Sequence, residues 1–257
     1  ELTYSGSIQE KKGPRVMGVD WDKYGAGTSL VIIEYDIANG LYKPIWRTEI
    51  PRSRFTLDNA IQKIIEINDF YELDYIYVDR GYGEHQVETL HRYGLEHPES
   101  GLHEKVIGVT YSDSINIIDP FTRLPAKKRL KHWVINQMQV LFERGQMALP
   151  PEDRVMFRQF ANYCVKGYTS NGEPVYSEKD EHILDAVGLA IHGMLKHFSD
   201  ICKVNVGKKV MVVHNPVARA DKRSYARKST PQTYGRRVQP VIGRRTFGSR
   251  GLGRARF

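Results

Sequence analysis

Three aspartates lie at positions where distant parts of the chain could bring carboxylates together. Asp20 and Asp79 each end a short apolar segment typical of a strand, and Asp185 lies near the start of a helix-periodic segment. The ends of neighbouring parallel strands converge at one edge of a sheet, and active sites lie at such edges. We therefore expect the three carboxylates to meet at one place.

Carboxylates that are brought together repel one another and take up protons unless a cation lies among them. Mg²⁺ and Mn²⁺ prefer oxygen ligands of this kind. Two such ions that share a carboxylate activate water and stabilise the leaving oxygen in phosphodiester cleavage. Asp20, Asp79 and Asp185 therefore predict a catalytic site that holds two Mg²⁺ or Mn²⁺ ions.

The same acids also have simpler explanations. An Asp at the end of a strand is more often a turn former or a helix cap than a metal ligand. Asp180 and Glu181 compete with Asp185 for the third ligand position, or they complement the dipole of the helix that follows. The apolar stripe of that helix, which includes Leu184, leaves Asp185 about 100° to one side, and this favours Asp185.

The elements that must position these acids follow from periodicity and turn residues. Strands are expected at 15–22, 29–35, 42–50, 75–79 and 106–110. Helices are expected from the N-cap Thr56 onward and at 83–93, 126–144, 152–163 and 181–198, with a hairpin around Asn171-Gly172. This order predicts an α/β fold with a mixed sheet flanked by helices.

Three motifs resemble those of ribonuclease H-like nucleases. They are Val16-Met17-Gly18-Val19-Asp20-Trp21-Asp22, Tyr77-Val78-Asp79, and His182-Ile183-Leu184-Asp185-Ala186-Val187-Gly188-Leu189-Ala190. In their order and spacing, residues 15–200 are most similar to the C-terminal nuclease domain of the large terminase subunit of tailed bacteriophages. The resemblance implies a ribonuclease H-like mixed β-sheet with a β-hairpin insertion.

This resemblance implies a metal-dependent endonuclease that cleaves double-stranded concatemeric viral DNA during genome packaging in the host cell cytoplasm, and that is not retained in the mature virion. Asp20 would be shared by both ions, Asp79 and Asp185 would each complete one ion site, and His182 would be auxiliary. A junction resolvase or transposase of the same superfamily, or a non-catalytic nucleic-acid-binding assembly module, is the alternative.

The resemblance also implies partners. The sequence has no G-x-x-x-x-G-K-[ST] phosphate loop, so a packaging ATPase domain would be a partner absent from this chain. The portal protein and the small terminase subunit are the other partners that the family implies.

Basic residues are expected to contact DNA in two regions. Arg80 follows Asp79, and Lys127, Lys128, Arg129 and Lys131 lie near the expected start of the helix at 126–144, where they could bind phosphates or form a solvated face. Residues 201–257 hold 15 Lys and Arg and one acid, whereas residues 1–200 hold 29 acids and 23 Lys and Arg. The chain is thus divided into a linker (1–14), a nuclease domain (15–200) and a basic, largely irregular tail (201–257) that would bind nucleic acid or the packaging machinery, or remain solvated.

The composition excludes other classes. No run of roughly 18 apolar residues and no signal-peptide pattern is present, so no membrane partner is expected. Only two cysteines occur, Cys164 and Cys202, which argues against a disulfide scaffold or a zinc module.

Overall fold

The computed structural model describes residues 2–3, 10–21, 27–81, 83–118, 122–170, 172–177 and 181–202. Two sequence-based predictions lie outside these residues: Asp180 as a possible ligand, and the basic tail from residue 203 onward. Within the described ranges, no helix is both long enough and apolar enough to span a bilayer.

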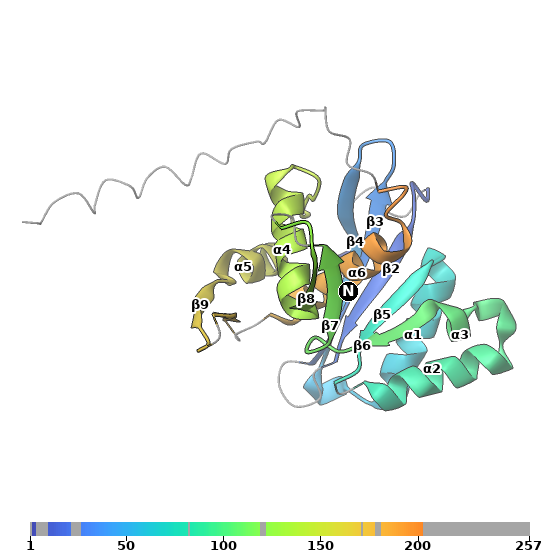
Figure 1. The fold of residues 1–257 in the computed structure, drawn as a ribbon. Helices are drawn as coiled ribbons and strands as arrows, with labels where there is room; N and C mark the ends of the chain where they lie inside the picture. The colour runs from blue at the N-terminus through green and yellow to red at the C-terminus, as the bar shows by residue number, and fades with distance from the viewer. Residues whose placement is uncertain are drawn as a thin grey trace, which may run out of the picture. The chain divides into compact units, whose positions relative to one another are not determined.

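A six-stranded mixed sheet forms the centre of the fold (Figure 1). Its strands, in spatial order, are β1 (Leu2–Thr3), β4 (Leu41–Pro51), β3 (Gly27–Asp36), β2 (Arg15–Asp20), β5 (Tyr75–Asp79) and β6 (Val106–Val109). Strands β2, β3 and β4 form an antiparallel meander, whereas β5 runs parallel to β2 and β6 runs parallel to β5. The predicted mixed α/β sheet is confirmed. The segment expected to be a linker contributes β1, which pairs with the edge of β4.

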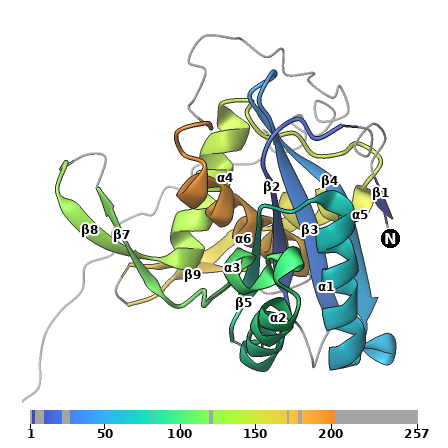
Figure 2. The same cartoon turned by 90° about the vertical axis from the view of Figure 1, so that its right-hand side faces the viewer.

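Helices cover both faces of the sheet (Figures 1 and 2). On one face lie α1 (Leu57–Tyr71), α2 (Glu84–Glu96) and α3 (Leu102–Lys105); on the other lie α4 (Leu130–Glu143), α5 (Arg154–Asn162) and α6 (His182–His197). Alternation along β2 divides the core in two, because Val16 packs with α4–α6 while Met17 and Val19 pack with α1 and α2. Short 3₁₀ turns at Arg52–Arg54 and Pro98–Ser100 complete the connections.

Two hairpins extend beyond the sheet. The hairpin of β9 (Val165–Tyr168) and β10 (Pro174–Tyr176) lies where the sequence predicted one. The hairpin of β7 (Ser114–Ile118) and β8 (Pro125–Arg129) was not predicted, and it projects away from the sheet (Figure 2).

The β7–β8 hairpin corrects the predicted helix at 126–144, because α4 begins only at Leu130. Ile115 and Ile117 alternate with polar residues along β7, and this strand gives residues 125–129 a pairing partner. The pairing outweighs the helix propensity of the lysines, since tertiary context overrides local preference. Lys127, Lys128 and Arg129 therefore lie on a strand, and only Lys131 lies on the helix.

Candidate active site

Asp20 and Asp79 end two neighbouring parallel strands and lie on the same face of the sheet. Val19 of β2 pairs in register with Val78 of β5, so the two aspartates are the next residues along adjacent strands. Side chains alternate along each strand, and Tyr77 packs in the core beneath α6, so Asp79 lies on the α6 side with Asp20. The structure thus brings these two predicted ligands to one sheet edge.

The third aspartate reaches this edge because α6 packs directly on β2. A Cβ atom at Gly18 would lie 1.8 Å from the carbonyl oxygen of Ala186, so only glycine permits this approach of helix and strand. Asp185 stands in the first turn of α6 and is 7% exposed, as is Asp20. The side-chain oxygen of Gln159, on α5, accepts hydrogen bonds from the backbone N–H groups of Ile183 and Leu184 at 3.0 and 3.3 Å. It therefore satisfies donors that a helix N-terminus leaves free.

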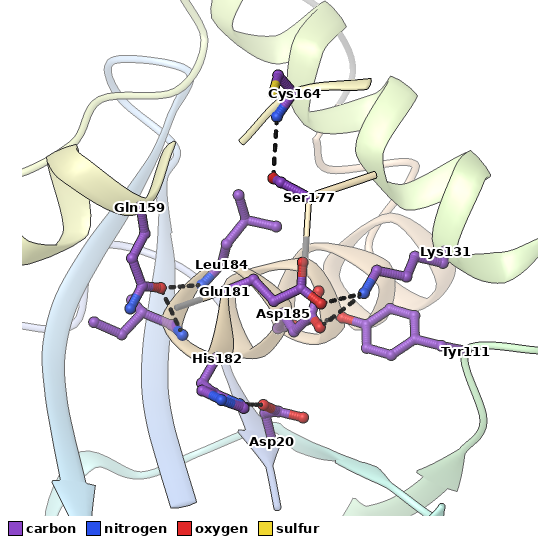
Figure 3. A network of polar contacts seen from close by, with 11 residues as sticks. Asp20, Tyr111, Lys131, Gln159, Cys164, Ser177, Glu181, His182, Leu184 and Asp185 are labelled. Carbon is purple, nitrogen blue, oxygen red and sulfur yellow. Dashed lines mark hydrogen bonds and ion pairs between the residues drawn. The ribbon is translucent and has the colours of Figure 1, made fainter. Parts of the chain in front are cut away.

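His182 connects the start of α6 to Asp20. Its Nδ1 lies 2.8 Å from Asp20 Oδ2, so the predicted auxiliary residue contacts a predicted metal ligand (Figure 3). The contact fixes the orientation of the Asp20 carboxylate, and it joins residues that are 162 positions apart in the chain.

The Lys131 side chain, from α4, lies between two carboxylates. One belongs to Glu181, which precedes α6, and the other to Asp185 in the first turn of α6. The Nζ of Lys131 is 3.0 Å from Glu181 Oε1 and 3.1 Å from Asp185 Oδ2, and Figure 3 shows both carboxylates directed toward the ammonium. The hydroxyl of Tyr111 donates a hydrogen bond to the Asp185 carbonyl at 2.5 Å. Lys131 was predicted as a DNA contact; in the structure it belongs to the carboxylate cluster.

Burial and the nearby charge of Asp20 raise the pKa values of the other two aspartates. Burial raises the pKa of Asp185 to about 7, even though Lys131 opposes the shift, and the negative charge of Asp20 adds to it. Burial also raises the pKa of Asp79, and Asp20 contributes in the same direction. Asp20 is therefore in electrostatic contact with both other aspartates.

The pKa of Lys131 is raised for the complementary reason. Burial alone would lower it, but the charges of Asp185 and Glu181 outweigh burial and keep the side chain an ammonium. The cluster therefore has excess negative charge that one lysine only partly offsets.

The donor set fits a hard divalent cation, although the side chains do not converge on one point. Within the part of the chain that the structure describes, no three His, Cys, Asp or Glu side chains are arranged around a common metal position. Asp185 Oδ1 and Glu181 Oε2 are, however, buried and without a hydrogen-bond partner among the described residues. A buried carboxylate oxygen without a partner costs free energy, and Mg²⁺ or Mn²⁺ prefers such oxygens.

The remaining basic residues lie outside this cluster. Arg80 is exposed and forms an ion pair with Glu84 at 2.5 Å, so its charge is partly offset. Lys127 and Arg129 share one face of β8, and Arg129 forms an ion pair with Glu173 in the β9–β10 hairpin at 3.4 Å. Lys128 lies on the opposite face of β8, toward α4.

Sequence reasoning missed two residues that build the site, Tyr111 and Gln159. Tyr111 lies two residues after Val109, the β6 residue that pairs with Asp79. This position beside a predicted ligand was the only feature of the sequence that could have indicated a role for Tyr111. Gln159 lies on the predicted helix at 152–163, but nothing in the sequence indicates that its amide caps α6.

The fold agrees with those of solved nucleases. The large terminase nuclease of the thermophilic phage G20c is 16% identical, with a TM-score of 0.53 over 74% of this chain and 91% of that chain. The same nuclease with bound magnesium is 16% identical, with a TM-score of 0.51 over 74% of this chain and 90% of the other. No protein-family model matches the sequence, and neither does any curated protein. The likeness to the solved structures shows that the chain has the ribonuclease H-like fold of the large terminase nucleases.

Proposed function

We propose that this chain is a metal-dependent endonuclease that cleaves double-stranded, concatemeric viral DNA during genome packaging. The observation that carries the proposal is the placement of Asp20 and Asp79 at adjacent parallel strand ends, on the sheet face where α6 brings Asp185. Nucleases of the same fold support it, since one of them is a terminase nuclease with bound magnesium.

Each acid would have a distinct part in holding two Mg²⁺ or Mn²⁺ ions. Asp20 would be shared by both ions because it is the one aspartate in electrostatic contact with both others, Asp79 and Asp185. The ions would supply Lewis acidity toward the scissile phosphate and an activated water. His182 orients Asp20, and Gln159 and Tyr111 fix the first turn of α6 that carries Asp185.

The substrate would be held by basic residues at the rim, because the cluster itself is negative. Lys127 and Arg129 point to one side of the projecting β7–β8 hairpin and are exposed. Both could contact DNA phosphates, and Arg129 would exchange its ion pair with Glu173 for such a contact. Lys128 and Arg80 are further candidates. The basic segment after residue 203 would add contacts to DNA or to the packaging machinery.

In this proposal the chain acts in the host cell cytoplasm as one part of a packaging motor. A packaging ATPase domain, the portal protein and the small terminase subunit would be its partners. DNA cutting would then be coupled to packaging by these partners.

Plasmid cleavage tests the proposal. Purified protein should convert supercoiled plasmid to linear DNA with Mn²⁺ or Mg²⁺ and not with EDTA. Asp20→Ala and Asp79→Ala should each abolish cleavage while the circular dichroism spectrum is unchanged. Glu66→Gln, an exposed acid on α1, is the matched control and should cleave normally.

Full cleavage by either aspartate variant would overturn the metal assignment. Preferential cutting of branched DNA would instead indicate a junction resolvase, and strand joining would indicate a transposase. Tight, salt-sensitive DNA binding without cleavage would indicate an assembly module.

A further inference from the structure

Lys131 is a partly buried, ion-paired lysine and not a fully exposed surface lysine. Its side chain is 25% exposed, and the carboxylates of Glu181 and Asp185 that it contacts are 14% and 10% exposed. The ammonium also lies 5.4 Å from the centre of the Tyr111 ring, on whose face a cation is stabilised.

The backbone holds Lys131 in this place. The N–H groups of Leu130 and Lys131 donate to the carbonyls of Asp113 and Tyr111 at 2.7 and 3.2 Å, so the start of α4 is joined to the loop after β6. Farther along, Val134 of α4 packs against Gly188 of α6. Lys131 therefore reaches Glu181 and Asp185 from a helix that is hydrogen-bonded to the loop after β6 and packed against α6.

The ammonium uses only one oxygen of each acid. The other oxygens, Glu181 Oε2 and Asp185 Oδ1, are buried and lack a hydrogen-bond partner among the described residues. The Glu181 and Asp185 carboxylates therefore accept one positive charge and still have buried oxygens without a partner among the described residues. This is the state expected when a lysine ammonium occupies a site that a divalent cation would bind more strongly.

We propose that Lys131 is a tethered counter-cation that competes with a divalent ion for the Glu181–Asp185 pair. This inference rests on the proposed function, since it concerns the Asp185 side of that metal site. The ammonium and a divalent ion repel each other at contact distance, so the ion binds there only when Lys131 moves away. Lys131 thereby weakens metal binding most on the Asp185 side, where its ammonium contacts the carboxylate, and less at Asp79, which its charge reaches without a direct contact.

Mn²⁺ titration of the full chain, followed by electron paramagnetic resonance of free Mn²⁺, tests this inference. Lys131→Met should bind the weaker of two Mn²⁺ ions at least about tenfold more tightly than the wild type, because the competing charge is removed. Lys131→Arg retains the charge and should not tighten binding. Lys196→Met removes an exposed lysine near the far end of the same helix and is the matched control, with an affinity within about twofold of wild type.

Thermal melting is a second readout, and like the Mn²⁺ titration it does not depend on DNA cleavage. In EDTA, Lys131→Met should melt at a lower temperature than wild type, because Glu181 and Asp185 lose their counter-charge. Mn²⁺ should then raise its melting temperature more than it raises that of the wild type. If Lys131→Met does not fold, Lys131→Met/Glu181→Gln compared with Glu181→Gln isolates the same competition.

Equal Mn²⁺ affinity in wild type and Lys131→Met would overturn the inference while leaving the metal site intact. If neither the wild type nor any variant binds Mn²⁺ at millimolar concentration, the proposed function fails, and the inference fails with it.

Discussion

His182 Nδ1 lies 2.8 Å from Asp20 Oδ2, and this contact joins the first turn of α6 to the end of β2. A ligand whose carboxylate is oriented by a neighbouring side chain keeps its geometry through the reaction. Removing such an outer partner costs about 10- to 100-fold in metal affinity or activity in metalloenzymes. His182→Ala should therefore lower the Mn²⁺-dependent plasmid cleavage rate by roughly this factor.

The control for this variant is His85→Ala, an exposed histidine on α2. It should cleave at the wild-type rate. His182→Asn retains a hydrogen-bonding group and should recover part of the lost rate. A His182→Ala variant with the wild-type rate would show that Asp20 needs no positioning partner.

Gly18→Ala tests the approach of β2 to α6. The added methyl group would meet the Ala186 carbonyl and the Ala190 amide nitrogen, which are backbone atoms of α6 and cannot move aside easily. We expect a loss of about 1–3 kcal/mol or more in the free energy of unfolding by urea, which is the range found for overpacked cores. Gly167→Ala on β9 has open space around its new Cβ atom and should leave stability nearly unchanged. Equal stability of the two variants would contradict the close packing.

These residues show how much of the site the sequence could predict. Asp20 and Asp79 were identifiable because each ends a short apolar segment typical of a strand, and the ends of neighbouring parallel strands converge at one edge of a sheet. The neighbours of the acids were not identifiable in the same way. Lys131 points at Asp185 only because α4 begins at Leu130, and that boundary depends on a hairpin partner in β7 that the helical pattern of 126–144 concealed.

The fold was predictable to a similar extent. The mixed sheet followed from the order of the predicted strands and helices, whereas β1 and the β7–β8 hairpin depend on pairing between segments that have weak local signals. Gln159 accepts a hydrogen bond from the N–H of Ile183, which lies 24 residues later in the chain. No local sequence pattern indicates a contact over that separation.

The buried His192 predicts a specific loss of stability in acid. Burial lowers its pKa to about 4, and its ring packs at right angles against Tyr77 and Trp133. The unfolded chain takes up a proton near the ordinary pKa of 6.5, so stability is lost as the pH falls from about 6.5 to about 4. The loss should reach up to about 3 kcal/mol, at about 1.4 kcal/mol for each pKa unit.

Urea unfolding at pH 7.5 and pH 4.5 measures this loss. His192→Phe keeps an aromatic ring and removes the titration, so its stability should fall less over this interval than that of the wild type. His85→Phe, at an exposed position, should fall as the wild type does. The same decrease in the wild type and His192→Phe would assign the acid sensitivity to other groups.

The β7–β8 hairpin should determine how DNA binding depends on salt. Lys127 and Arg129 share one exposed face of β8. Each phosphate contact that is lost should reduce the slope of log K against log salt by about 0.9. Lys127→Ala and Arg129→Ala should therefore weaken duplex binding and flatten its salt dependence, as measured by fluorescence anisotropy. Lys196→Ala is the control of equal charge, and a slope that changes equally in all three variants would mean that the hairpin makes no specific contact.

Anomalous diffraction from crystals soaked in MnCl₂ tests most directly whether the three aspartates form a metal centre. We predict Mn²⁺ within coordination distance of Asp20, with Asp79 and Asp185 as its neighbours, and loss of that signal in Asp20→Asn crystals. Manganese bound only elsewhere, or a signal at this sheet edge that persists in Asp20→Asn, would contradict the account.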